Sequence, residues 1–366
     1  SAYVDDCMGE EPNVVEGTCD SSWTHVTKRY ETDPAEALPS QHLGSQMEWM
    51  KDGEFYIQDT DMSGYSGLII EHHEQRFGKR HGETSDVPLT VDLINEDPDI
   101  DQSVTSDEDI DWVGTFCGMI QWFTTCGRKD AAFAACSFSS RIQSWNDLCW
   151  SQAHKFVAYL RKWGHLVSRS QVHQSEYAWN LMHVIHSDAN ANAKKGKATS
   201  CYDSALVGHK GTYIQGGFGS KRQPIETDSS GASEAFGAHY GTREGIHIAI
   251  LLGDLLEKNG GDPRVHLFVD NTAAKALFTI GYSRKLALYS RALRGRLSFI
   301  FGCIRDGIMT AGYVPTEENR ADLGTKVLTR IAFHNALAMN YIVPKGTRAQ
   351  PSYQSATAPT KLVATI

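Results

Sequence analysis

Hydrophobic and polar positions along the chain follow a helical period before about residue 180. Residues 113–126 and 147–163 are apolar at helical spacing, and the second stretch carries Leu148, Phe156 and Leu160 on one stripe. Apolar residues recurring three and four positions apart make one buried helix face. The pattern therefore predicts two amphipathic helices that pack through ordinary core contacts.

Two further patterns precede these helices. Residues 47–58 contain two mixed apolar runs separated by Asp52-Gly53, a dipeptide suited to a tight primed turn, so we expect a β-hairpin. Residues 93–112 are acidic, contain proline and lack a helical period. This composition predicts a surface linker.

After residue 180 the pattern changes to short buried strands that alternate with helices. Such alternation predicts an α/β (α+β) fold with a mixed sheet and flanking helices. Ser229-Ser230 provides capping hydroxyls for a helix that should run to about Lys258, before Asn259-Gly260-Gly261. The expected strands are 181–188, two within 199–217, 264–270 and 308–316, and the other expected helices are 271–280, 284–306 and one opening at 317–326.

Charge divides the chain into an acidic and a basic part. The net charge is -9, yet residues 1–111 hold 27 of the 44 acidic and 6 of the 35 basic side chains. The basic remainder is suited to a phosphate backbone. No run of eighteen apolar residues predicts a membrane span, and the eight cysteines lack zinc-binding or disulfide-framework spacing.

Four carboxylates fall at the ends of elements in the second half of the chain: Asp188, Glu234, Asp270 and Asp322. If the strands are neighbours in one sheet, these side chains can converge at one edge. Neighbouring carboxylates disfavour each other's ionisation, and divalent cations resolve that conflict. Oxygen-only ligands favour Mg²⁺ or Mn²⁺, and a pair of such ions can hydrolyse a phosphodiester.

The motifs around these carboxylates resemble the ribonuclease H domain of copia-type long-terminal-repeat retrotransposons. The chain reads HSDANAN, GKATSCY, SKRQP, SSGASEAF, VDNTAA and YVPTEENRADLGTKVL in the family's order and spacing. The resemblance implies a ribonuclease H-like sheet and a two-ion site of Mg²⁺ or Mn²⁺ on Asp188, Glu234, Asp270 and Asp322. It also implies cleavage of the RNA strand of RNA–DNA hybrids.

Upstream motifs extend the resemblance to the reverse transcriptase of the same Pol polyprotein. They are YVDD at 3–6, KDGEFY, FCGMIQWF, RKDAAFAACSFSSR and WSQAHKFVAYLRK. The implied organisation is a partial palm over 1–100, an acidic linker and helical thumb or connection over 101–170, a ribonuclease H-like domain over 180–340 and a disordered tail over 345–366. By resemblance, the 47–58 hairpin would be a primer grip.

The same resemblance assigns partners and a setting. Asp5 and Asp6 would be a polymerase remnant whose missing palm strand, fingers and integrase belong upstream in a longer parent chain. The implied contacts to template–primer phosphates are Arg128, Lys129, Arg141, Lys155, Arg161 and Lys162. No membrane partner is expected, and the setting would be a cytoplasmic particle or the nucleus. An alternative is a catalytically dead or repurposed remnant that binds nucleic acid, since the family's second aspartate is Asn190 here.

Overall fold

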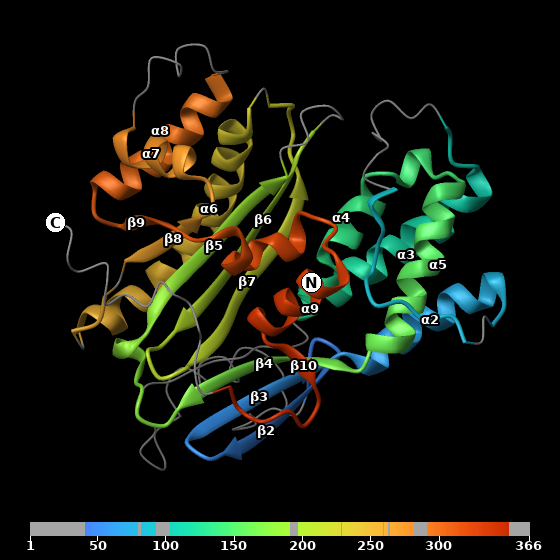
Figure 1. Cartoon of the computed structure of the whole chain (residues 1–366), viewed down its shortest axis with the longest axis horizontal. Coiled ribbons are helices and arrows are strands. Elements are labelled where there is room, and N and C mark those ends of the chain that lie inside the picture. Colours follow the sequence, from blue (N-terminus) through green and yellow to red (C-terminus); the bar gives the residue numbers. More distant parts are fainter. Residues whose placement is uncertain are drawn as a thin grey trace, which may run out of the picture.

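A computed structural model describes residues 41–79, 82–92, 103–190, 197–227, 229–258, 260–262, 264–281 and 291–350. Ten strands within these ranges form one mixed sheet, and helices cover its faces (Figure 1). The α/β class with a mixed sheet is therefore confirmed. None of the described helices combines the length and apolar character needed to cross a bilayer.

The strands and helices have the following bounds. The strands are β1 (Gln41–His42), β2 (Ser45–Asp52), β3 (Phe55–Asp61), β4 (Leu166–His173), β5 (Met182–Asn190), β6 (Thr199–Val207), β7 (Tyr213–Arg222), β8 (Val265–Val269), β9 (Met309–Tyr313) and β10 (Ile342–Pro344). The α-helices are α2 (Ser63–Phe77), α3 (Asp107–Thr125), α4 (Ala132–Ser139), α5 (Asp147–Trp163), α6 (Ser230–Lys258), α7 (Thr272–Ile280), α8 (Arg291–Arg305) and α9 (Arg330–Met339). Short 3₁₀ turns include η2 (Lys129–Ala131) and η7 (Arg320–Gly324).

Strand β5 lies between β6 and β8 in the sheet. Its order is β1-β2-β3-β4-β7-β6-β5-β8-β9, with β10 paired to β4. Strands β5, β6 and β7 form an antiparallel meander, whereas β8 runs parallel to β5 and β9 runs parallel to β8. Because β5 and β8 are parallel neighbours, residues that follow each strand lie at the same edge of the sheet.

Helix α6 follows the predicted bounds and packs closely on the sheet. The hydroxyl of Ser229 accepts a hydrogen bond from the backbone N–H of Ala232, as a capping residue does. Gly237, Gly241 and Gly245 recur every four residues along the helix, and added Cβ atoms there would lie 2.8 Å from the Asp188 carbonyl oxygen, 2.9 Å from Tyr202 Cβ and 2.0 Å from Ile185 Cδ1. The missing side chains let the α6 backbone contact β5 and β6 directly.

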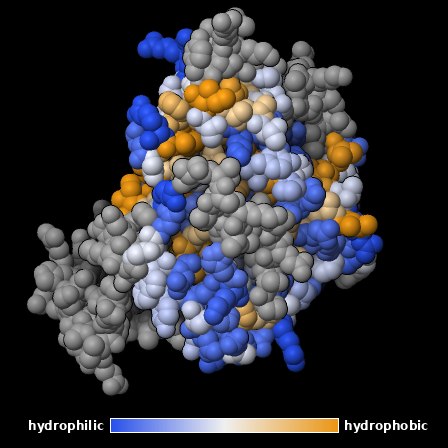
Figure 2. Space-filling model, turned by 60° about the vertical axis from the view of Figure 1, so that its left-hand side comes forward, coloured by the Kyte–Doolittle hydropathy of each residue, from blue (hydrophilic) through white to orange (hydrophobic). Residues whose placement is uncertain are grey.

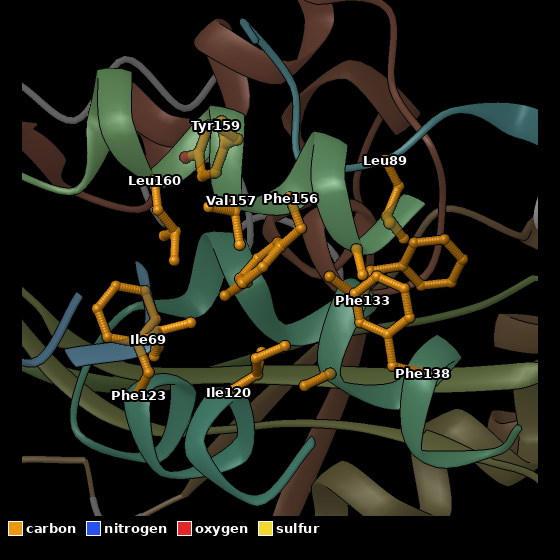
Figure 3. Close-up of a cluster of buried hydrophobic side chains, with 14 of the residues drawn as sticks. Ile69, Leu89, Ile120, Phe123, Phe133, Phe138, Phe156, Val157, Tyr159 and Leu160 are labelled. Atoms are coloured by element: carbon orange, nitrogen blue, oxygen red, sulfur yellow. The ribbon is translucent and has the colours of Figure 1, made fainter. Parts of the chain in front are cut away.

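A large hydrophobic core lies among α2, α3, α4 and α5 and extends to α9 and to Leu323. Figure 3 shows Ile120, Phe156 and Phe133 pointing toward one another from α3, α5 and α4. The two predicted helices at 113–126 and 147–163 are thus confirmed. Burial of these apolar side chains, worth roughly 25 cal/mol per Å², stabilises the helical layer.

Helix α3 starts earlier than the sequence pattern predicted. Residues 93–102 lie outside the described ranges, but Asp107–Thr125 is helical, so the linker prediction over 93–112 is wrong from residue 107 onward. Asp107, Glu108 and Asp109 form the first turn, where negative charge is favourable beside the free N–H groups. The same acidic composition that is typical of a linker here favours the start of a helix.

The structure confirms the 47–58 hairpin and corrects the expectation for the start of the tail. β2 and β3 pair antiparallel, which confirms the hairpin, but its two-residue turn is Gly53-Glu54 because Asp52 still pairs with Phe55. β3 then pairs with β4. Disorder from residue 345 was expected, and this is wrong for residues 345–350. Arg169 Nη1 donates to the Thr347 carbonyl oxygen at 2.6 Å, and Gln171 Nε2 donates to that of Gln350 at 2.7 Å. Residues 351–366 lie outside the described ranges.

The outer surface shows no single dominant character on the face drawn in space-filling form. Hydrophilic and hydrophobic residues are interspersed there (Figure 2). Scattered exposed apolar side chains are normal on folded proteins. This face of the surface therefore does not by itself indicate a binding site.

Candidate metal centre

Two aspartates lie side by side because β5 and β8 are parallel. Asp188 is in β5 and is 1% exposed, and Asp270 directly follows β8. Ser187 pairs in register with Val269, so the two aspartates occupy equivalent positions on neighbouring strands. The hydroxyl of Thr316 donates to Asp270 Oδ2 at 2.9 Å, and the hydroxyl of Thr325 donates to Asp188 Oδ2. Both carboxylates are thus oriented by hydroxyl groups.

The third aspartate comes from a 3₁₀ turn. Asp322 was expected in the last helix, and this is wrong: it lies in η7, ahead of α9. Asn319 caps η7 through its Oδ1 and donates from Nδ2 to the Ser187 carbonyl oxygen at 3.1 Å, which ties η7 to β5. A separate cap on Thr329 starts α9. Two capping side chains in succession split the expected single helix.

These elements bring three carboxylates together. One oxygen from each of Asp188, Asp270 and Asp322 lies within 4.8 Å of the others. Glu234 approaches from α6, just after its first turn, and it is 5% exposed. Gly237, one turn later, allows α6 to contact the backbone of Asp188. The structure thus gathers three of the four predicted carboxylates, and Glu234 lies near enough for their charges to act on it.

Burial and mutual repulsion disfavour ionisation within this cluster. Burial, followed by the charge of Asp188, raises the pKa of Asp322 to about 7. The same two causes raise the pKa of Asp270, and they raise that of Glu234 well above its usual value. Within the described residues, Glu234 Oε2 is buried and has no hydrogen-bond partner. A buried, unpartnered carboxylate oxygen beside like charges is costly without a cation.

Lys326 supplies one positive charge to the cluster. Its Nζ lies 2.8 Å from Asp322 Oδ1, 3.3 Å from Asp188 Oδ2 and 4.0 Å from Asp270 Oδ2. Burial opposes the charged form of this amine, but Asp188 and Asp322 outweigh burial and raise its pKa above the ordinary value. The sequence motif that contains Thr325 and Lys326 did not predict a role for this lysine. The available signal was its position four residues after Asp322.

The residues present fit one or more divalent cations. Four carboxylates face a single ammonium group, so the cluster retains excess negative charge when all four are ionised. Every donor is a carboxylate oxygen, which suits Mg²⁺ or Mn²⁺ better than zinc. The unpartnered Glu234 Oε2 is one oxygen such an ion could bind.

Three of the six basic residues predicted to contact nucleic acid are buried in the structure. Arg128, Lys129 and Arg141 are buried, at 0%, 0% and 2% exposed, so the prediction that they contact phosphates is wrong for this structure. Arg128 binds Asp130 in a bidentate manner, with bonds of 2.9 and 2.7 Å, and also donates to main-chain carbonyl groups. Buried charges of this kind persist because they are paired.

The remaining three basic residues lie on α5 and are not fully buried. Arg161 Nη2 contacts Glu74 Oε1 at 3.0 Å, and Lys162 Nζ contacts Asp86. Lys155 is half-buried. Phosphate binding by these three stays a prediction, and Asp5 and Asp6 lie outside the described residues.

A buried ionic cluster that the sequence did not reveal lies beneath the site. Lys129 Nζ contacts Asp203 Oδ1 and also the Tyr213 hydroxyl at 3.2 Å, while Arg320 Nε contacts Asp203 Oδ2 at 3.1 Å. Asp203 pairs in register with His186, two residues before Asp188 and on the same face of β5. The cluster therefore joins η2, β6 and η7, the turn that carries Asp322.

Comparisons with known proteins give a limited result. No protein-family model matches the chain, and no curated protein matches it. Among solved structures, RNase H1 from the archaeon Halobacterium salinarum is similar over 39% of this chain and 94% of its own, at 18% identity and a TM-score of 0.27. LC11-RNase H1 in complex with RNA/DNA hybrid is similar over 39% and 93%, at 17% identity and a TM-score of 0.29.

A viral enzyme shows a similar degree of likeness. The protease–reverse transcriptase of prototype foamy virus is similar over 46% of this chain and 22% of its own, at 11% identity and a TM-score of 0.24. At such scores these likenesses carry no functional conclusion.

Proposed function

We propose that residues 180–340 form a metal-dependent nuclease of the ribonuclease H type, which cleaves the RNA strand of RNA–DNA hybrids. The observation that carries this proposal is the convergence of Asp188, Asp270 and Asp322, with a buried, unpartnered oxygen on Glu234, whose ionisation their charges disfavour. The order of elements supports it: three antiparallel strands, helix α6, the parallel strand β8 and further helices match the order that the resemblance implies.

The reaction is hydrolysis of a phosphodiester. Water attacks phosphorus, the bond from phosphorus to the 3′ oxygen breaks, and the products carry a 5′-phosphate and a 3′-hydroxyl. Divalent ions held by the four carboxylates would supply charge stabilisation at the phosphate and a lowered pKa for water. Thr316 and Thr325 hold Asp270 and Asp188 in fixed orientations, and the close contact at Gly237 fixes Glu234 against β5.

The proposed substrate is a hybrid duplex of A-like shape. Proteins recognise such duplexes through shape, phosphates and 2′-hydroxyl groups. The basic balance of residues 112–366, with 29 of the 35 basic side chains, supports binding to a polyanion. We further propose a copia-type origin, DNA synthesis only in a longer parent chain, and a cytoplasmic or nuclear setting.

The test uses the full chain with labelled RNA–DNA hybrid and Mg²⁺ or Mn²⁺. Asp270→Asn should abolish cleavage because it removes a charged ligand and keeps the side chain's size. Asp306→Asn is the matched control, since Asp306 is an exposed partner of Arg305 beyond α8. No cleavage by the unmodified chain, or cleavage that survives Asp270→Asn, would overturn the proposal. Hybrid binding without any cleavage would support the inactive remnant instead.

A further inference from the structure

The position of Lys326 inside the carboxylate cluster has a consequence for metal binding. Its ammonium group contacts oxygens of Asp322, Asp188 and Asp270 at 2.8, 3.3 and 4.0 Å. It therefore lies among the same three side chains whose oxygens gather within 4.8 Å. An ammonium group and a divalent cation cannot both occupy the space enclosed by those oxygens.

The charges around the cluster make Lys326 an internal counter-ion. Among the described residues, Lys326 forms every ion pair recorded for these three aspartates. The neighbouring Thr316 and Thr325 donate hydroxyl hydrogen bonds and bring no charge. Glu234 faces the same cluster from α6 and leaves one oxygen unpartnered. One ammonium thus partly neutralises a site that holds four carboxylates.

The exposure of Lys326 allows it to leave. Its side chain is 31% exposed, whereas the side chain of Lys129 in the cluster below is 0% exposed. A lysine at the solvent boundary can rotate its flexible stem outward without opening a cavity in the core. A buried lysine such as Lys129 could not move without leaving Asp203 poorly compensated.

We propose that Lys326 is a tethered counter-ion that holds the metal-free site together and competes with divalent cations, so that it sets the metal concentration at which the site fills. This inference rests on the proposed function, because it takes the four carboxylates as metal ligands. Each binding event then includes displacement of the ammonium from its three contacts. Because the ammonium must be displaced, the carboxylates bind a divalent cation more weakly than they would without Lys326.

The experiment measures Mn²⁺ binding by calorimetry to the full chain without nucleic acid. Lys326→Met keeps the length of the stem and removes the charge, and it should bind Mn²⁺ about tenfold more tightly or better, because a close competing charge is gone. Lys326→Arg keeps the charge and should show weak binding like that of the unmodified chain. Lys345→Met is the matched control, since Lys345 also contacts two acids, Glu48 and Asp61, outside the site.

Thermal unfolding in EDTA gives the second readout. Without metal, Lys326→Met should lower the melting temperature because four carboxylates lose their counter-ion, and saturating Mn²⁺ should raise it by more than in the unmodified chain. Equal or weaker Mn²⁺ binding by Lys326→Met, with binding lost in Asp270→Asn, would overturn this inference and leave the metal site intact. No Mn²⁺ binding by the unmodified chain or by Lys326→Met would overturn both.

Discussion

Lys129 and Asp203 form a fully buried ion pair that joins the helical layer to the strand beside Asp188. Both side chains are 0% exposed, and Arg320 Nε contacts the other Asp203 oxygen at 3.1 Å. The same Arg320 belongs to η7, the turn that carries Asp322. The upstream helices therefore support the geometry of the carboxylate edge through charge as well as apolar packing.

Removing one member of this buried ion pair should lower the free energy of unfolding strongly. Lys129→Met leaves Asp203 with one fewer cation in a dry environment, and we expect the free energy of unfolding to fall by about 3–5 kcal/mol. Lys155→Met is the comparison, since Lys155 is half-buried on α5. Urea denaturation of both variants measures the difference. If both variants lose the same free energy of unfolding, the buried ion pair contributes no more to stability than a half-buried lysine does.

The close approach of α6 to β5 predicts the effect of one methyl group. In Gly237→Ala, the new Cβ would lie 2.8 Å from the Asp188 carbonyl oxygen, so α6 must shift and carry Glu234 with it. We expect a loss of about 1–3 kcal/mol in the free energy of unfolding, together with weaker Mn²⁺ binding.

A second glycine in the same helix gives the control for that change. At Gly231 the nearest atom to an added Cβ is 4.0 Å away. Gly231→Ala should therefore stabilise the chain by roughly 0.5–1 kcal/mol through helix propensity and leave Mn²⁺ affinity unchanged. Similar behaviour of the two alanine variants would argue against the close-contact explanation.

The unpartnered oxygen of Glu234 predicts a stability effect whose sign depends on metal. In EDTA at neutral pH, Glu234→Gln removes a buried carboxyl group beside Asp188 and Asp270, so the free energy of unfolding should rise by about 1–2 kcal/mol. With saturating Mn²⁺ the variant should lose part of the stabilisation that metal gives. Glu244→Gln, further along α6 at a half-buried ion pair, should show neither change. Destabilisation of Glu234→Gln in EDTA would contradict the predicted repulsion.

Buried histidines predict a loss of stability in mild acid. Burial, and then the neighbouring His266, lower the pKa of His183 to about 4 from its usual 6.5. Below pH 6.5 the unfolded chain binds a proton at this residue that the folded chain does not, so the free energy of unfolding falls as pH decreases to about 4. The contribution is about 3 kcal/mol. Urea denaturation across this range should show a shallower slope for His183→Asn, and parallel slopes would contradict the assignment.

Local patterns were sufficient to predict much of the second half of the chain. Asp270 directly follows β8 as predicted from the buried apolar run before it, whereas β5 continues two residues past Asp188 to Asn190. The limits of α6 followed from Ser229-Ser230 and the glycines after Lys258. Asp322 was assigned to the wrong element because two caps, Asn319 and Thr329, compete within eleven residues. Short 3₁₀ turns have weak sequence signals of their own.

Long-range partners set the limit of that prediction. Arg128 and Lys129 resemble surface residues in sequence, and their burial depends on Asp130 and on Asp203, which is 74 residues further along the chain. No local pattern indicates that a lysine will meet an aspartate from a distant strand. The same applies to Lys326, whose contact with Asp322 follows from a spacing of four residues but whose contacts with Asp188 and Asp270 require the folded sheet.

The most direct test of the central claim is a cleavage assay of the unmodified full chain on an RNA–DNA hybrid labelled on both strands, across a titration of Mg²⁺ or Mn²⁺. The proposed site predicts that the RNA strand is cut, that the DNA strand stays intact and that excess EDTA stops the reaction. Cutting of both strands, cutting that persists in EDTA, or no cutting at any metal concentration would contradict the account.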